Sequence, residues 1–186
     1  TVTIQNDVTN AITVNLDAAT TADTNAVNAS TYTGVLTLVA GTDTALNVDA
    51  GVTSTLTGGT GTSDELKIVG DTYTAAQLAS VTAIENFVQS DDVSSSITID
   101  ELNIADGKTL TIDVRSVINA SNTTTIDAID DTNGILTVHG STGVDTITGS
   151  SSDLGDTIYG YSGSDIIKVS AAQFTTLDTI DAGAGT

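Results

Sequence analysis

The segment Gly140-Ser-Thr-Gly143-Val-Asp145-Thr-Ile147-Thr148 is followed, 20 residues later, by Gly160-Tyr-Ser-Gly163-Ser-Asp165-Ile-Ile167-Lys168. Both fit the nine-residue pattern G-G-x-G-x-D-x-U-x, where U is a large apolar residue, with Ser and Tyr replacing the second glycine. Glycine permits tight loops with positive φ, and the residues after the aspartate alternate as a strand does. The pattern therefore predicts short strands joined by tight acidic loops, one loop per structural turn.

Looser copies of the pattern occur elsewhere in the chain. Gly58 to Leu66 fits with one residue inserted before Asp64, Ser151 to Ile158 is a more distant relative, and Ala182 to Thr186 would be a further copy if Asp came next. The tripeptide Asp-Thr-Ile occurs three times, and Asp-Ile-Ile is a variant of it; these begin at Asp145, Asp156, Asp178 and Asp165. Because the last copy stops within the motif, we expect the chain to be a piece of a longer protein.

Short alternating segments rich in Val, Ile, Leu and Thr predict strands along the whole chain. The expected strands are 2–4, 12–16, 35–38, 46–48, 66–68, 97–99, 110–112, 135–138 and 166–169. Only Ala75 to Phe87 could hold a helical turn. The motif Ala75-Ala-Gln-Leu78 recurs as Ala171-Ala-Gln-Phe174, each time after a Gly-rich loop and a strand, which suggests one structural cassette used twice.

This repetition predicts an all-β fold, a right-handed parallel β-solenoid with calcium-binding Gly-Asp loops. Turns of about 20 residues would give about nine turns and a rod on the order of 40 Å long. We divide this continuous solenoid into degenerate turns in 1–57, a Gly-rich loop with further turns in 58–139, and the regular turns in 140–186. The alternative is a β-sandwich in which the Gly-Asp segments are ordinary hairpin turns with solvated acids.

Stacking one turn on the next places Asp145 above Asp165, and Asp156 above Asp178 on the opposite edge. Two carboxylates about 5 Å apart repel by about 3 kcal/mol at an effective dielectric constant of 20. A cation between them reverses the sign of this energy. Carboxylate and carbonyl oxygens are suitable ligands for calcium, so the loops predict several calcium ions.

These loops resemble the RTX (repeats-in-toxin) β-roll family and, more broadly, the acidic β-solenoids of bacterial S-layer proteins and large adhesins. The resemblance implies that loop carbonyls and Asp side chains of successive turns bind calcium, and that the chain folds outside the cell after type I secretion. The close matches cover about residues 140–186. The candidate calcium-binding residues are Asp145, Asp165, Asp156, Asp178, Asp64, Gly140, Thr142, Gly143, Gly160, Ser162, Gly163, Gly58, Gly61 and Asp153.

Composition excludes several function classes. With 24 acidic and four basic residues, the formal charge is −20, so the chain lacks the Lys and Arg clusters that bind nucleic acid. The absence of Cys excludes disulfides, and no apolar run approaches the roughly 20 residues that span a bilayer. Most acids outside the motifs are expected to be solvated loop residues: Asp17, Asp23, Asp43, Asp91, Asp92, Asp130 and Asp131.

Catalysis has few candidate residues, because His139 is the only histidine and Arg115 the only arginine. We therefore expect a non-enzymatic protein. The first expectation is a structural segment of a secreted bacterial surface-layer protein, located at the cell surface and contacting copies of itself. The alternatives are a spacer or ligand-binding region of a type I-secreted adhesin, with polysaccharide bound by regions outside this chain, and a calcium-binding accessory module of a secreted enzyme. A flat Thr array, as in ice-binding solenoids, is disfavoured by the irregular turn lengths.

Overall fold

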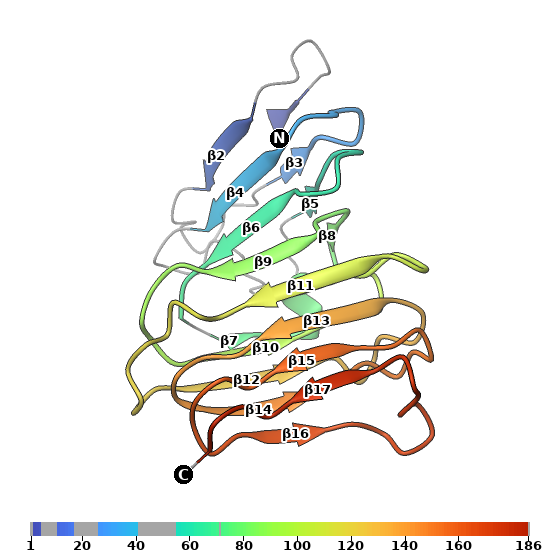
Figure 1. Ribbon diagram of the computed structural model, residues 1–186. Helices are drawn as coiled ribbons and strands as arrows, with labels where there is room; N and C mark the ends of the chain where they lie inside the picture. The colour runs from blue at the N-terminus through green and yellow to red at the C-terminus, as the bar shows by residue number, and fades with distance from the viewer. Residues whose placement is uncertain (1, 5–10, 17–25, 41–54, 71, 186) are drawn as a thin grey trace.

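The chain forms a β-solenoid whose strands all pair in parallel, as seen in the computed structural model of Figure 1. The structure describes residues 2–4, 11–16, 26–40, 55–70 and 72–185. Parallel strands cannot be joined by tight hairpins, so each strand pairs with one from the next turn rather than with its neighbour in sequence. This arrangement confirms the predicted β-solenoid and excludes the β-sandwich of hairpins.

Three sheets run along the solenoid. The long sheet contains β2 (Ile12–Leu16), β4 (Leu36–Ala40), β6 (Glu65–Ile68), β9 (Asn86–Gln89), β11 (Thr109–Asp113), β13 (Ile135–His139), β15 (Thr157–Tyr159) and β17 (Thr179–Asp181). The first short sheet contains β1 (Val2–Thr3), β3 (Ala26–Asn28), β5 (Thr55–Thr57) and β8 (Val81–Thr82). The second short sheet contains β7 (Thr72–Tyr73), β10 (Ser95–Thr98), β12 (Thr123–Asp127), β14 (Val144–Thr148) and β16 (Ile166–Lys168).

The turn formed by residues 65–89 visits all three sheets in succession, through β6, β7, β8 and β9. The first short sheet ends at β8 and the second begins at β7, while the long sheet continues past both. This turn is therefore the transition between the two halves of the solenoid. Because the long sheet crosses residues 57–58 and 139–140, the three predicted segments share one sheet.

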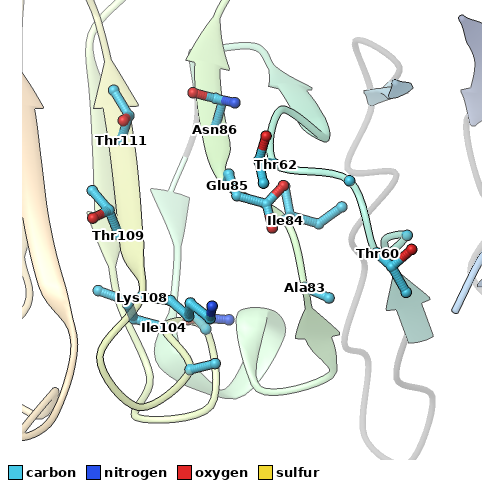
Figure 2. Close-up of a pocket in the computed structure, with 14 residues that line it drawn as sticks. Thr60, Thr62, Ala83, Ile84, Glu85, Asn86, Ile104, Lys108, Thr109 and Thr111 are labelled. Carbon is cyan, nitrogen blue, oxygen red and sulfur yellow. The ribbon is translucent and has the colours of Figure 1, made fainter. Parts of the chain in front are cut away.

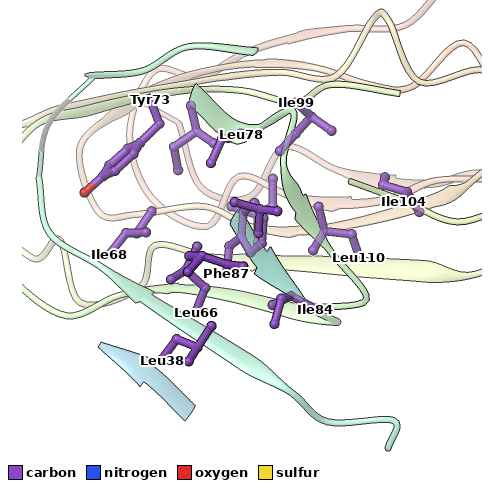
Figure 3. Packing of buried hydrophobic residues seen from close by; sticks show 14 of the residues in the cluster. Leu38, Leu66, Ile68, Tyr73, Leu78, Ile84, Phe87, Ile99, Ile104 and Leu110 are labelled. Atoms are coloured by element: carbon purple, nitrogen blue, oxygen red, sulfur yellow. The ribbon is translucent and has the colours of Figure 1, made fainter. Parts of the chain in front are cut away.

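Inward side chains form apolar columns between the sheets. One column on the long sheet pairs Phe87 with Ile112, Ile112 with Val138, and Val138 with Ile158, all of them buried. Around Phe87, the side chains of Leu66, Ile84 and Leu110 pack in the interior, as Figure 3 shows. β-Branched and leucine side chains suit this thin interior because each turn repeats the same width. The core therefore needs few aromatic residues.

The predicted strands are largely confirmed, except that 46–48 lies outside the described residues. The predicted count of about nine turns is too high, because the long sheet has eight strands among the described residues. Paired positions lie 20 residues apart at Val138 and Ile158 but 29 apart at Ile97 and Ile126. The 20-residue spacing of the C-terminal motifs therefore does not extend to the earlier, longer turns.

The one helix among the described residues, α1 (Ala75–Leu78), lies within the segment predicted to hold a helical turn. Thr74 caps it, since the Thr74 hydroxyl accepts from the Gln77 N–H and the Gln77 side chain accepts from the Thr74 N–H, a capping box. No helix in the described part of the chain has the length and apolarity required to cross a membrane.

The two copies of the cassette occupy different corners of the solenoid. The Gly58–Asp64 loop leads from β5 of the first short sheet into β6 of the long sheet. The Gly160–Asp165 loop instead leads from β15 of the long sheet into β16 of the second short sheet. The matching sequences therefore share a local loop and turn but not the same place in the stack.

Loops rather than strands absorb the differences in turn length, so outward positions stay in register. Thr111, Thr137, Thr157 and Thr179 occupy successive paired positions on the outer face of the long sheet. The expectation that irregular turns would prevent Thr alignment is therefore wrong for this one column.

Asn103 joins two turns from inside the loop between β10 and β11. Its buried side-chain amide donates to the carbonyl oxygens of Leu78 at 2.7 Å and Val81 at 2.8 Å. Its side-chain oxygen accepts from the Asp100 N–H at 2.7 Å. Because one side chain satisfies three backbone groups, its loss leaves several of them without partners.

We expect Asn103→Ala to lower the free energy of unfolding by about 2–4 kcal/mol, because two carbonyls and one N–H lose their partners. Leu102→Ala, in the same loop at an exposed position, serves as the control and should change stability by less than about 0.5 kcal/mol. Chemical denaturation of both variants measures the difference. Equal effects of the two substitutions would contradict the role assigned to Asn103.

Candidate functional site

Acidic residues in successive turns are joined by one recurring hydrogen bond. In each case the backbone N–H of the first acid donates to the side-chain carboxylate of the second, one turn later. The N–O distances are 2.9, 3.0 and 2.7 Å in the pairs Asp64–Glu85, Asp145–Asp165 and Asp156–Asp178, respectively, which we call the acid pairs. Each acid pair therefore ties two neighbouring turns together through a side chain.

The Asp145–Asp165 pair lies where the chain passes from the long sheet to the second short sheet. Asp145 is fully buried, and its carboxylate accepts from the Ser141 N–H at 2.7 Å and the Ser141 hydroxyl at 2.8 Å. One carboxylate oxygen of Asp165, Oδ2, is buried and has no hydrogen-bond partner. The predicted stacking of Asp145 on Asp165 is confirmed by the strand register, in which Thr146 pairs with Ile166.

The Asp156–Asp178 pair lies at the opposite corner, where the chain returns to the long sheet. The buried Asp156 carboxylate accepts from the backbone N–H groups of Leu136 and Ser150 and from the Ser150 hydroxyl, at 2.7–3.1 Å. Asp178 in turn accepts from the Thr175 N–H. The predicted placement of this pair on the opposite edge is confirmed.

The Asp64–Glu85 pair repeats the arrangement at the entry to β6 and β9. Asp64 is buried and accepts from the Leu36 N–H of the preceding turn at 2.8 Å and from the Gly59 N–H of its own loop at 2.6 Å. Leu36 and Leu136 therefore play the same part for Asp64 and Asp156. Glu85 was not among the candidates, although it follows Asp64 by one turn length, the spacing that identified the other two pairs.

The glycines of the two best motifs bring oxygen atoms close together. A Cβ at Gly140 would lie 2.6 Å from Asp145 Oδ2 and 2.8 Å from the carbonyl oxygens of Tyr159 and Gly160. Gly163 has a φ of +129°, and a Cβ there would collide with the Gly143 carbonyl oxygen. Only glycine fits where successive turns approach this closely.

The remaining predicted calcium-binding residues do not take part in the hydrogen bonds of the acid pairs. Thr142 lies beside Val117, whose carbonyl oxygen accepts its N–H at 3.2 Å, and Ser162 forms a parallel bridge with Ala184. Gly58 and Gly61 line the approach of the Asp64 loop to the neighbouring turns. Asp153 is exposed, unlike Asp156 in the same loop.

Burial raises the pKa of Asp145 and Asp156, while the hydrogen bonds that each accepts act in the opposite direction. The carboxylates of Asp165 and Asp178, respectively, raise these pKa values further. The salt bridges among the described residues, Lys67–Glu65 and Arg115–Asp113, involve no member of an acid pair. The acid pairs therefore concentrate negative charge that no basic side chain neutralises by a salt bridge.

Asp131 was expected to be a solvated loop acid, but the structure buries it completely. Its Oδ2 accepts from the Gly134 N–H at 3.1 Å, and its Oδ1 is buried without a partner. Burial raises the pKa of Asp131 to about 6, and the nearby carboxylates of Glu101 and Asp156 contribute to the rise. The negative charge of Asp131 is therefore unfavourable in the folded state, a feature that the spacing of the sequence motifs does not reveal.

The donor set at the Asp145–Asp165 corner fits a hard cation in chemical type. Calcium takes about six to eight oxygen ligands, including carboxylates and backbone carbonyls. The converging oxygens around Gly140 and the unpartnered Asp165 Oδ2 are of this kind. Within the described residues, no three His, Cys, Asp or Glu side chains form a group that could hold a metal ion, so backbone carbonyls would have to supply further ligands.

A cavity of about 470 Å³ opens beside Glu85, as Figure 2 shows. It lies where the short loop 83–85 falls between the longer loops 58–64 and 99–108. Glu85, Lys108 and several Thr side chains line it. The lining holds one carboxylate and one ammonium group but no histidine or cysteine, so it offers no nucleophile activated by a neighbouring imidazole.

Comparisons with known proteins add no identity: no protein-family model, no curated protein and no solved structure matches this chain. The function must therefore be argued from the acid pairs and the surface of the solenoid.

Asp131→Asn should stabilise the protein above pH 6 in the presence of a chelator. The folded-state pKa of about 6 lies above the ordinary value of 3.8, so the folded state binds this proton more tightly. The contribution of this bound proton to the stability of the folded state is fully present below about pH 4 and is lost as the pH rises through 6. The substitution should thus add about 1–3 kcal/mol at pH 7.5 and much less at pH 4.5, measured by denaturation. A loss of stability at pH 7.5 would contradict this assignment.

Proposed function

We propose that this chain is a rigid structural segment of a secreted bacterial surface-layer protein, stabilised by calcium ions at its acid pairs. The observation that carries the proposal is the recurrence of the same acid-to-acid link between turns in a chain of formal charge −20. A protein that only needed to fold could join its turns with neutral side chains. Carboxylates repeated at the corners instead suit a protein that meets divalent cations outside the cell.

Calcium would be held by the carboxylates of Asp145 and Asp165 together with the carbonyl oxygens of Tyr159 and Gly160. When bound, it would supply the positive charge that the corner lacks. The chain's own contribution is to position these oxygens: Ser141 orients the Asp145 carboxylate, and Asp165 fixes the turn beneath it. The same logic extends to the Asp156–Asp178 pair, whose first acid is oriented by Ser150.

The shape supports a structural role. The long sheet stacks eight strands, which at about 4.8 Å per strand gives a rod of roughly 35 Å. Because each turn contacts mainly its neighbours, such a rod resists bending when the links between turns are strong. We propose an extracellular location at the cell surface, reached by type I secretion, and no catalytic activity.

The last turn of the isolated chain offers a surface for contact between copies. Phe174 and Leu177 are 58% and 64% exposed, whereas their counterparts in the first cassette, Leu78 and Val81, are 1% and 0% exposed. The strands of this turn, β16 and β17, each pair on one side only. In the isolated chain, these unpaired strand edges and exposed apolar side chains are a surface on which a second copy can stack.

A ligand-binding or spacer region of a type I-secreted adhesin is the second candidate. The observation that favours it is a cluster of aromatic and charged side chains on the outer face of the long sheet, around His139 and Tyr159. The role of accessory module to a secreted enzyme has no comparable support from the described residues.

Calcium should raise the melting temperature of the chain, and Asp165→Asn should reduce that response. At a concentration 100 times the dissociation constant, one site adds about 2.7 kcal/mol, or roughly 5–10 °C for a chain of this size. The amide oxygen that this substitution introduces can still accept the Asp145 N–H, so the variant removes charge while retaining the link.

The matched control for this titration is Asp106→Asn, at an exposed position in the loop between β10 and β11. It should respond to calcium as the parent does, whereas Asp165→Asn should be more stable than the parent in chelator and less responsive to calcium. An identical calcium response of all three proteins, or none in the parent, would refute calcium binding at this pair.

Leu177→Asp should block assembly without unfolding the chain, since Leu177 is exposed in the isolated protein. In calcium, we expect the parent to form filaments or two-dimensional arrays visible by electron microscopy, and the variant to stay monomeric by light scattering. Thr176→Asp, an adjacent exposed substitution of equal charge, is the control. A parent protein that remains a monomeric rod at high calcium would count against the surface-layer role.

A further inference from the structure

The rarest side chains of this chain gather at one place on its surface. The only histidine, the only arginine and two of the four tyrosines lie together with one aspartate. The members of this aromatic patch are Asp113, Arg115, His139, Tyr159 and Tyr161. Since aromatic residues make up only 3% of the sequence, this grouping is not a general property of the surface.

Three successive turns build the patch through strand register. Asp113 pairs with His139, and His139 pairs with Tyr159, on the outer face of the long sheet. The rings of His139 and Tyr159 stack with centroids 5.5 Å apart and planes 9° apart. Tyr161 lies beside both, with centroids 6.1 and 6.0 Å away, and its hydroxyl is 2.9 Å from His139 Nδ1.

Tyr161 occupies a position that favours glycine. Its φ is +67°, and the equivalent residue one turn later, Gly183, has a φ of +74°. In the motif this is the second glycine. A tyrosine in this conformation is less favourable than a glycine, so we infer that contacts of its ring compensate for the backbone strain. The contact with His139 supplies part of this compensation, yet the Tyr161 side chain remains 39% exposed.

Polar groups surround the rings in fixed positions. The Arg115 guanidinium donates to both carboxylate oxygens of Asp113, at 2.9 and 2.5 Å, while its side chain stays 57% exposed. Burial and the nearby Arg115 charge lower the pKa of His139, against the opposite effect of Asp113, which favours the neutral imidazole. The patch therefore carries one positive and one negative charge that cancel, on a molecule of formal charge −20.

We propose that the aromatic patch binds an uncharged pyranose sugar, such as a unit of a neutral cell-surface polysaccharide. A pyranose has an apolar face of C–H groups that packs on an exposed aromatic ring, and hydroxyls around its rim that need both donors and acceptors. Tyr161 offers the ring, and Arg115, Asp113 and His139 offer the donors and acceptors. The adjacent column of Thr111, Thr137 and Thr157 adds hydroxyl groups.

The local charge and the neighbours favour this ligand over others. An acidic polysaccharide would be repelled by the chain as a whole and would find Arg115 already paired with Asp113. In the centre of a protein–protein interface, exposed aromatic rings usually lie within an apolar surface, whereas the rings of this patch lie beside the polar Thr column. This inference does not depend on calcium binding at the acid pairs.

The test uses the whole chain with cellohexaose, maltohexaose and chitohexaose as uncharged probes, and a hexamer of galacturonate as the acidic comparison. Saturation-transfer NMR detects binding, and the Tyr and His ring resonances report its place. We expect at least one uncharged probe to bind and shift the His139 and tyrosine signals, and the acidic hexamer to bind at least tenfold more weakly.

Tyr161→Gly removes the ring and suits the backbone, so it should keep the melting temperature while weakening binding at least tenfold. Arg115→Lys keeps the charge, lies outside the Gly160 loop and loses the paired donors, and should weaken binding severalfold. Lys168→Ala, at an exposed position on β16 of the second short sheet, is the control and should bind normally. No binding of any uncharged probe, unchanged binding by Tyr161→Gly, or self-association that this variant abolishes would each overturn the proposal.

Discussion

A hydrogen bond from the backbone N–H of one acid to the carboxylate of the acid one turn later is the interaction on which this solenoid depends. It occurs in all three acid pairs and joins turns that also contact each other through strand edges, apolar columns and buried side chains such as Asn103. A charged acceptor makes the bond stronger than a neutral one, but it also places negative charge inside the stack. Stability and charge are thus coupled at the same atoms.

This coupling explains why the molecule should respond to its surroundings. Buried carboxylates such as Asp145, Asp156 and Asp131 have raised pKa values, so either protons or cations can relieve their electrostatic cost. Protons relieve it only at acidic pH, whereas divalent cations relieve it at neutral pH. If calcium binds as we propose, the segment is more stable in calcium than in its absence.

Register has a second consequence, on the outer surface. Loops of different length return each strand to the same alignment, so outward residues distant in sequence form straight columns. The Thr column and the aromatic patch both arise in this way. The surface chemistry of the solenoid is therefore set by which residue occupies a given strand position, and neighbouring columns can serve different partners.

The sequence by itself determined the strand-rich repeat and the Gly-Asp loops. It also determined the pairing of Asp145 with Asp165 and of Asp156 with Asp178, because in turns of 20 and 22 residues the distance along the sequence tells which residues lie above one another. Only the tertiary structure decided that Asp131 is buried and that His139 meets Tyr161. Both features depend on the paths of loops, which local spacing does not encode. Whether these side chains are buried, and which residues they contact, depends on how all the turns stack.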